Sequence, residues 1–183
     1  IIPIISNQKE KVLKKAREIE KELKKNYEVI LDEREEYSPG WKYAEYELKG
    51  IPIRIEIGPK DLEKEQIVLV RRDNGKKEFV KIKKLKDDVK KNLEQMQDFL
   101  YQKAKKFLDS NIVKVGNWNQ FIREIKNKKL VLAKFCGNKE CEEWIKDKSK
   151  GAGSRCIPLK QEKISGNCVY CNKKAKYWTY FGK

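Results

Sequence analysis

The first part of the chain alternates short apolar runs with amphipathic stretches. Residues 1–5 are almost entirely apolar and predict a strand, and the apolar positions of residues 8–25 recur at helical spacing. We expect Asn7 to cap this helix, with Glu10 three residues later as in a capping box. A second apolar strand is predicted over residues 27–31.

Residues 38–61 carry the clearest transition from a helix to a strand. Ser38 can cap free N–H groups and Pro39 suits the first helical position, so we predict a helix over residues 39–49. A glycine and a proline end it. Strict alternation over residues 51–57 then predicts a strand with isoleucines on one face and charged side chains on the other.

A hairpin is predicted next, because residues 66–72 and 76–82 flank the turn sequence Asp-Asn-Gly. The expected order is therefore β-α-β-α-β-β-β, which is typical of an α/β layer with a mixed sheet. No glycine-rich phosphate loop and no internal repeat occurs in the sequence.

The second part begins with a long predicted helix over residues 86–109, and we place a domain boundary near residue 85. The expected apolar stripe of that helix is Val89, Leu93, Met96, Leu100, Ala104 and Phe107. A strand over residues 112–115, a helix capped by Asn117 and a strand over residues 129–135 follow. We expect Trp118 and Phe121, the aromatic side chains of the helix capped by Asn117, to lie in a core.

The chain is strongly basic, with 44 Lys and Arg against 28 Asp and Glu and a formal charge of +16. Residues 1–85 hold 21 basic and 17 acidic side chains, a net of +4, whereas residues 86–183 hold 23 and 11, a net of +12. A polyanion is therefore the expected partner. Because lysine far outnumbers arginine, we expect attraction to phosphate more than base reading in the second half.

The sequence contains no histidine, which excludes Ser-His-Asp triads and histidine-metal catalysis. No apolar run approaches the ~20 residues that span a bilayer, and no charged-then-apolar leader precedes the first strand, so we expect a cytoplasmic protein without a membrane partner. A start inside a strand without an initiator methionine indicates a segment of a longer chain.

Four of the five cysteines form a C-x4-C pair, Cys136 and Cys141, and a C-x2-C pair, Cys168 and Cys171, separated by 26 residues. With each pair in a turn, the four thiolates can form the tetrahedral site that zinc prefers, which leaves no open position for water and is structural. Cys156 is expected to be a small buried side chain. It remains an alternative ligand in place of Cys136 or Cys141.

Five side chains of residues 38–61 are suited to reading a splayed-out guanine of an RNA. Tyr43 and Glu47 share a helix face, Arg54 projects from the polar face of the strand, and Lys60 and Asp61 follow its end. Aromatic rings stack on a base, carboxylates accept from guanine N1–H and N2–H2, and arginine donates to its acceptors. The alternative is an amphipathic helix with solvated charges.

The stretch PGWKYAEYELKGIPIRIEIGPKD, residues 39–61, resembles the anticodon-binding signature of archaeal/eukaryotic-type prolyl-tRNA synthetases. The ending CVYCNKKAKYWTYFGK, residues 168–183, resembles the terminal zinc domain of the same family. The resemblance covers essentially the whole chain. It implies a mixed-sheet class II synthetase anticodon-binding domain over residues 1–85, its first strand cut short, and an α+β zinc-binding C-terminal domain over residues 86–183.

The resemblance further implies the tRNA-recognition portion of a proline–tRNA ligase, an enzyme that uses ATP and Mg²⁺ and is usually a homodimer. The implied partners are the anticodon stem-loop of proline tRNA and an upstream catalytic domain. Tyr43 would stack on an anticodon guanine, whereas Glu47, Arg54, Lys60 and Asp61 would read guanine edges. The four paired cysteines would hold structural Zn²⁺.

Two departures from the family pattern stand out. The catalytic domain is absent, and the chain ends in Gly182-Lys183, whereas the family typically ends in tyrosine. Two alternatives therefore stay open: a free-standing synthetase-like RNA-binding module that acts in trans, and a zinc-stabilised protein-interaction domain.

Overall fold

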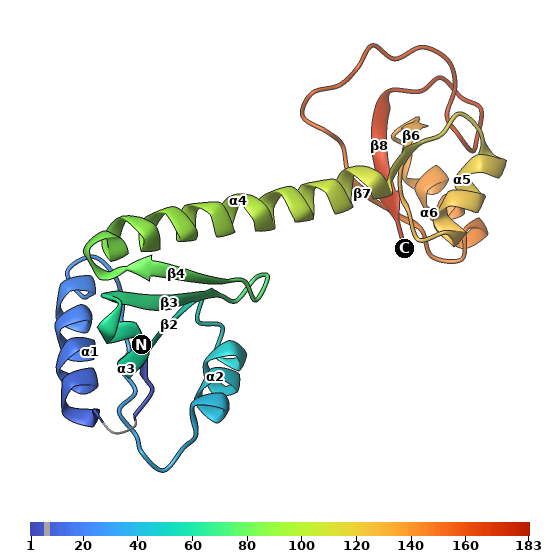
Figure 1. Ribbon diagram of the computed structural model, residues 1–183. Coiled ribbons are helices and arrows are strands. Elements are labelled where there is room, and N and C mark those ends of the chain that lie inside the picture. Colours follow the sequence, from blue (N-terminus) through green and yellow to red (C-terminus); the bar gives the residue numbers. More distant parts are fainter. Residues whose placement is uncertain (6–7) are drawn as a thin grey trace. The chain divides into compact units, whose positions relative to one another are not determined.

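The computed structural model describes residues 1–5 and 8–183 and divides by its contacts into two units (Figure 1). Unit 1 is Ile1–Gln102 and unit 2 is Lys103–Lys183. The expected cap at Asn7 lies outside the described residues. Within the described part of the chain, no helix has both the length and the apolar character required to cross a membrane.

Unit 1 is a mixed α/β layer, as predicted. Its sheet has the order β1-β2-β3-β4, in which β1 runs parallel to β2 and the other pairs are antiparallel. The elements are β1 (Ile2–Pro3), α1 (Lys9–Leu23), α2 (Pro39–Leu48), β2 (Ile53–Ile57), α3 (Pro59–Glu63), β3 (Gln66–Arg71), β4 (Lys77–Lys81), the 3-10 turn Ile82–Lys84 and α4 (Leu85–Asn111).

The core of unit 1 lies against one face of this sheet. Val12, Ala16 and Ile19 of α1 recur at helical spacing and are buried. They belong to one cluster with the strand residues Ile55, Ile57, Ile67, Leu69 and Val80 and with Leu85 and Val89 of α4. The isoleucine face of β2 is therefore the core face, as the alternation predicted.

One local prediction in unit 1 was wrong, and one short helix was missed. Residues 27–31 form no strand: Tyr27 N–H donates to Leu23 O at the end of α1, and the Ile1 amine donates to Ile30 O at 2.7 Å, which is too little pairing for a ladder. After β2 comes the short helix α3, which the sequence pattern did not predict. It forms because Pro59 occupies the first helical position and the Asp61 carboxylate accepts from the Gly58 N–H at 2.9 Å.

The buried carboxylate of Asp32 links the segment before α2 to that helix through hydrogen bonds and ion pairs. Asp32 accepts two hydrogen bonds from the Arg34 guanidinium, at 3.0 and 2.7 Å, and lies 3.4 Å from the buried Lys42 ammonium. The Tyr46 hydroxyl donates to the same carboxylate at 3.2 Å. These bonds, chiefly those from Arg34, hold the pKa of Asp32 well below its usual range.

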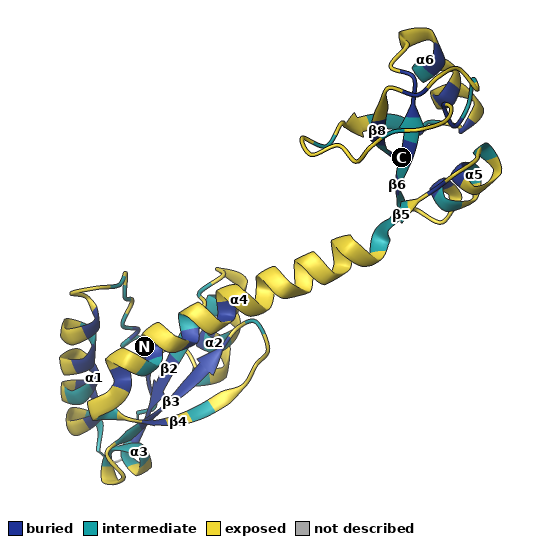
Figure 2. Cartoon of the chain, turned by 90° about the horizontal axis from the view of Figure 1, so that it is seen from above, coloured by how far each residue is buried: buried dark blue, intermediate teal, exposed yellow. Residues whose placement is uncertain are grey.

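The apolar stripe predicted for α4 is buried only in its first half. Leu85, Val89 and Met96 are buried, whereas Leu100 is 42% and Phe107 71% exposed. Figure 2 shows this change from blue to yellow along the helix. The side chains of α4 are buried against unit 1 only as far as Met96. Helical spacing therefore identified the apolar stripe but did not indicate how much of it is buried.

Unit 2 is built on a second four-stranded sheet, of order β5-β6-β8-β7. Its elements are β5 (Ile112–Lys114), α5 (Trp118–Lys126), β6 (Leu130–Phe135), α6 (Lys139–Lys148), β7 (Gly153–Cys156) and β8 (Tyr177–Gly182). The Asn117 side chain caps α5 by accepting from the Gln120 N–H at 3.0 Å, as predicted. Phe121 and Phe181 meet edge to face in the core, which confirms the interior position of Phe121. Trp118 is partly buried and packs against the same core.

Candidate nucleic-acid interface and metal centre

Three of the five predicted base-reading side chains meet between α2 and β2. The Arg54 guanidinium lies 4.0 Å from the centroid of the Tyr43 ring and donates to the Glu47 carboxylate at 2.7 Å. Tyr43 and Glu47 are brought together by their four-residue spacing on α2, which begins where the Ser38 hydroxyl accepts from the Trp41 N–H. Arg54 reaches them from the polar face of β2.

Glu56 is a member of this cluster that the sequence reasoning did not include. Its buried carboxylate accepts from Arg54 Nε at 3.0 Å, and a second oxygen lies 3.6 Å from the Lys77 ammonium. Arg54 is thus held between the carboxylates of Glu47 and Glu56. The i, i+2 spacing of Arg54 and Glu56 on one strand face was the available signal.

Burial and charge keep the Tyr43 hydroxyl protonated. Desolvation, followed by the negative charge of Glu56, raises the pKa of Tyr43 to about 12. The ring is therefore neutral at every physiological pH. Its ability to stack on a base will not change with pH in that range.

Asp61 and Lys60 lie on the first turn of α3. The Asp61 carboxylate is half-buried and contributes to the raised pKa of Tyr43, which places its charge near the ring. One of its oxygens is engaged with the Gly58 N–H. Lys60 is exposed.

This cluster offers the groups that recognise a guanine, but they are paired with one another. Arg54 occupies a position against the Tyr43 ring and neutralises Glu47. A base that uses these groups must exchange with contacts already made, which favours a ligand that supplies both a π-face and hydrogen-bond donors and acceptors.

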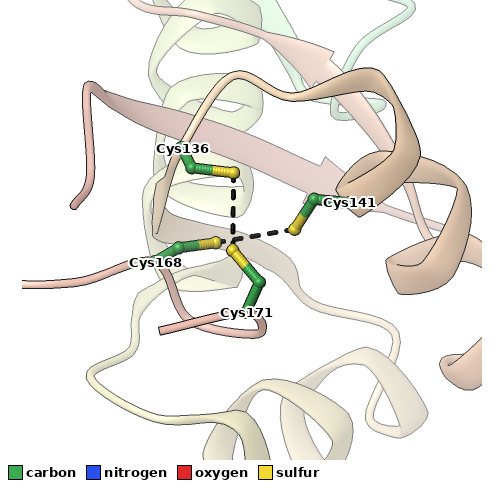
Figure 3. A group of neighbouring side chains, drawn as sticks. All are labelled: Cys136, Cys141, Cys168 and Cys171. Atoms are coloured by element: carbon green, nitrogen blue, oxygen red, sulfur yellow. Dashed lines mark hydrogen bonds between the residues drawn. The ribbon is translucent and has the colours of Figure 1, made fainter. Parts of the chain in front are cut away.

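The two cysteine pairs converge in unit 2 (Figure 3). The sulfurs of Cys136, Cys141, Cys168 and Cys171 lie within 4.8 Å of one another, with 3.8 Å between Cys141 and Cys168 and 3.6 Å between Cys136 and Cys171. A tetrahedron of 2.3 Å Zn–S bonds has edges of about 3.8 Å. These four thiols can hold a metal ion, and the donor set fits zinc.

Three elements place the four sulfurs. Cys136 follows β6, where Gly137 turns the chain with a φ of 78° and closely faces the Tyr177 ring. Cys141 lies in the first turn of α6, which the Asn138 side chain caps, so the expectation of a turn for both pairs was wrong here. Cys168 and Cys171 lie in the turn closed by the bridge between Asn167 and Lys174.

The surroundings of the thiols differ. Burial raises the pKa of Cys136 and of Cys141. Burial also acts to raise the pKa of Cys171, but hydrogen bonds from the backbone N–H of Lys173 and from the neighbouring thiols outweigh it, so that this pKa is lowered. Cys156 lies on β7 and is exposed, so the expectation that it is buried was wrong. It lies outside the four-sulfur group.

Comparison with known proteins gives a family match within each unit. Residues 1–92 match the family described as anticodon binding domain, and residues 118–183 match the family described as prolyl-tRNA synthetase, C-terminal. The first of these matches covers half of the chain. The first matched region contains Arg54 with its neighbours Tyr43, Glu47 and Glu56, called here the arginine cluster. The second contains the four cysteines.

Curated relatives align along the whole chain. It is 44% identical over 184 residues to a proline–tRNA ligase of Ruminiclostridium cellulolyticum and 45% identical over 184 residues to one of Clostridium botulinum. A proline–tRNA ligase 2 of Bacillus cereus is 43% identical over 185 residues. All of this chain but only 38% of each relative is covered. The chain belongs to the anticodon-binding domain family and carries, after that domain, the C-terminal region typical of prolyl-tRNA synthetases.

Proposed function

We propose that this chain is the tRNA-recognition portion of a proline–tRNA ligase and that unit 1 reads the guanines of the proline anticodon. The observation that carries the proposal is the convergence of Arg54 with Tyr43 and Glu47 in a domain that matches the anticodon-binding family. An aromatic ring, a guanidinium and a carboxylate at one place are the complement of a flipped-out guanine.

Each predicted residue has one role in this proposal. Tyr43 stacks on a guanine, Arg54 donates to its O6 and N7 acceptors, and Glu47 and Asp61 accept from its N1–H and N2–H2. Lys60, exposed beside Asp61, adds a donor or a phosphate contact. Exchange of the Arg54–Glu47 ion pair for contacts to the base makes recognition depend on both partners.

The metal in unit 2 is zinc and its role is structural in this proposal. Cys136, Cys141, Cys168 and Cys171 supply four thiolates and leave no position for a substrate or a water molecule. When bound, the ion crosslinks the end of β6, the start of α6 and the C-x2-C turn.

This sequence covers 38% of the length of its relatives, and the proposal assigns catalysis to the remainder of such a protein. An upstream class II catalytic domain in the same chain would bind ATP and Mg²⁺, activate proline and transfer it to proline tRNA in the cytoplasm, as a homodimer. Residues 1–85 would form the anticodon-binding domain. Residues 86–183 would form the connecting helix and the zinc-binding domain.

Two other functions make different predictions. A free-standing module would bind the same RNA in trans from a gene that encodes no catalytic domain. A zinc-stabilised protein-interaction domain would meet RNA only through its lysines, so that binding would depend on salt and not on base identity.

Replacing Arg54 by alanine tests the base-reading role. We expect a loss of about 1–3 kcal/mol of discrimination between an anticodon stem-loop with its guanines and one with adenines in their place, because a bidentate contact is removed. The measurement is the ratio of the two dissociation constants at fixed salt. The control is Arg17→Ala, which removes an exposed arginine from α1 and should leave the ratio unchanged. A wild-type ratio in Arg54→Ala would exclude this role for Arg54.

A further inference from the structure

The strand register places a second set of side chains on the face of the sheet that carries Arg54 and Glu56. Across β2, β3 and β4, one row is Arg54, Val70 and Lys77, and the next is Glu56, Val68 and Phe79. Since successive side chains of a strand alternate between faces, all six lie on the same side. Lys77 and Phe79 therefore continue the candidate interface to the edge strand β4.

Phe79 is exposed although its neighbours in the row are not. Its exposed fraction is 71%, whereas Val68 is 8% and Glu56 5% exposed. Val80, the next residue, points to the opposite face and is 6% exposed within the core of unit 1. Figure 2 shows this contrast as the dark-blue β3 beside the mostly yellow β4. A ring this exposed contributes little to the core.

Charge around Phe79 is suited to a polyanion. Lys77 and Lys81 flank it at i−2 and i+2 on the same face, and both are exposed. Lys77 also reaches across β3 to Glu56, whose carboxylate holds Arg54. Neighbouring strands are about 4.8 Å apart, so β4 lies about 10 Å from β2 across the sheet. The ring and its lysines are thus continuous with the arginine cluster.

We propose that Phe79 is a second stacking platform, which binds the base next to the guanine held at Tyr43 and Arg54 while Lys77 and Lys81 contact the RNA backbone. This inference rests on the proposed function and extends it from one nucleotide to the adjoining one. In known single-strand RNA modules, aromatic side chains on an open sheet face stack successive bases. Here Phe79 lies on such a face, on β4, and Tyr43 lies on α2, in contact with Arg54 of the same face. Such stacking tolerates any base, because every base has a π-face.

The experiment uses the whole chain and an RNA stem-loop with two adjacent guanines in its loop. 2-Aminopurine, whose fluorescence falls when it stacks, is placed on either side of the guanine pair. We expect Phe79→Ala to raise the dissociation constant at least fivefold and to abolish the fluorescence decrease at one of the two positions. Phe79→Tyr, which keeps a ring, should behave as wild type.

The matched control is Phe107→Ala on α4, because Phe107 is also 71% exposed. It should change the dissociation constant less than twofold. If Phe79→Ala binds within twofold of wild type with the same fluorescence decrease, the inference is overturned. If the wild-type chain does not distinguish the guanine stem-loop from one with adenines, the proposed function itself has failed. If the wild-type chain does distinguish the two RNAs but Phe79→Ala binds like wild type, only the stacking role of Phe79 is rejected and the proposed function stands.

Discussion

Replacing Cys168 and Cys171 together by serine is expected to unfold unit 2. Metal binding to a four-thiolate site is coupled to folding and is worth about 10–16 kcal/mol in small zinc peptides. That is as large as the whole stability of a typical domain. The buried sulfurs lie in the same cluster as Phe121 and Phe181, so loss of the crosslink would also open the core. A chelator should have the same effect on the unmodified chain.

The measurement is the zinc content per chain together with thermal unfolding followed by circular dichroism. We expect about one zinc ion in the unmodified chain, none in the double variant, and loss of one unfolding transition while that of unit 1 remains. Cys156→Ser is the matched control, because Cys156 is exposed and outside the cluster. Equal metal content and equal melting of the double variant and the control would exclude a structural metal at these cysteines.

Replacing Asp32 by asparagine is expected to destabilise unit 1 by about 3 kcal/mol. The change leaves the buried Lys42 ammonium without its counter-charge and weakens both hydrogen bonds from Arg34. It also loosens the segment that leads into α2 and so the support of Tyr43. The measurement is the free energy of unfolding in urea. Glu36→Gln, which changes an exposed carboxylate of the same segment, should have no effect beyond about 0.5 kcal/mol.

The unmodified chain and Asp32→Asn should also differ in how their free energy of unfolding depends on pH. The pKa of Asp32 is lowered by folding, so the stabilisation is fully present above its ordinary pKa of about 3.9 and is lost as the pH falls below that value. Asp32→Asn should remove this part of the acid dependence. The difference in unfolding free energy between the two proteins would then shrink as the pH is lowered from 5. A difference that stays constant to low pH would contradict the assigned ion pair.

Elements whose signals are local were predictable from the sequence. Ser38 and Pro39 determine where α2 begins, and Asn117 does the same for α5. The turn between β3 and β4 follows from Asp-Asn-Gly. The two cysteine spacings favoured the four sulfurs that do converge, although Cys156 stayed open in place of Cys136 or Cys141. In each case a few adjacent residues determine the conformation or the site.

The remainder depends on contacts between distant segments. Residues 27–31 are apolar enough for a strand, but their neighbour is Ile1, at the very start of the chain, and the hydrogen bonds at this residue do not extend into a ladder. The second half of α4 has an apolar stripe that unit 1 does not bury. The strands β7 and β8 were missed because they form only by pairing with each other and with β6. The i, i+2 spacing on β2 could have placed Glu56 beside Arg54, but the contacts of Arg54 with Tyr43 and Glu47 depend on α2 packing beside β2.

In the proposed function, unit 1 recognises guanine bases and does not bind RNA only as a polyanion. The most direct test compares binding of proline tRNA with binding of a variant in which both anticodon guanines are changed to adenine, by filter retention at one salt concentration. We expect at least tenfold weaker binding of the variant, because two bases lose their specific hydrogen bonds. Equal affinity for the two RNAs would contradict it.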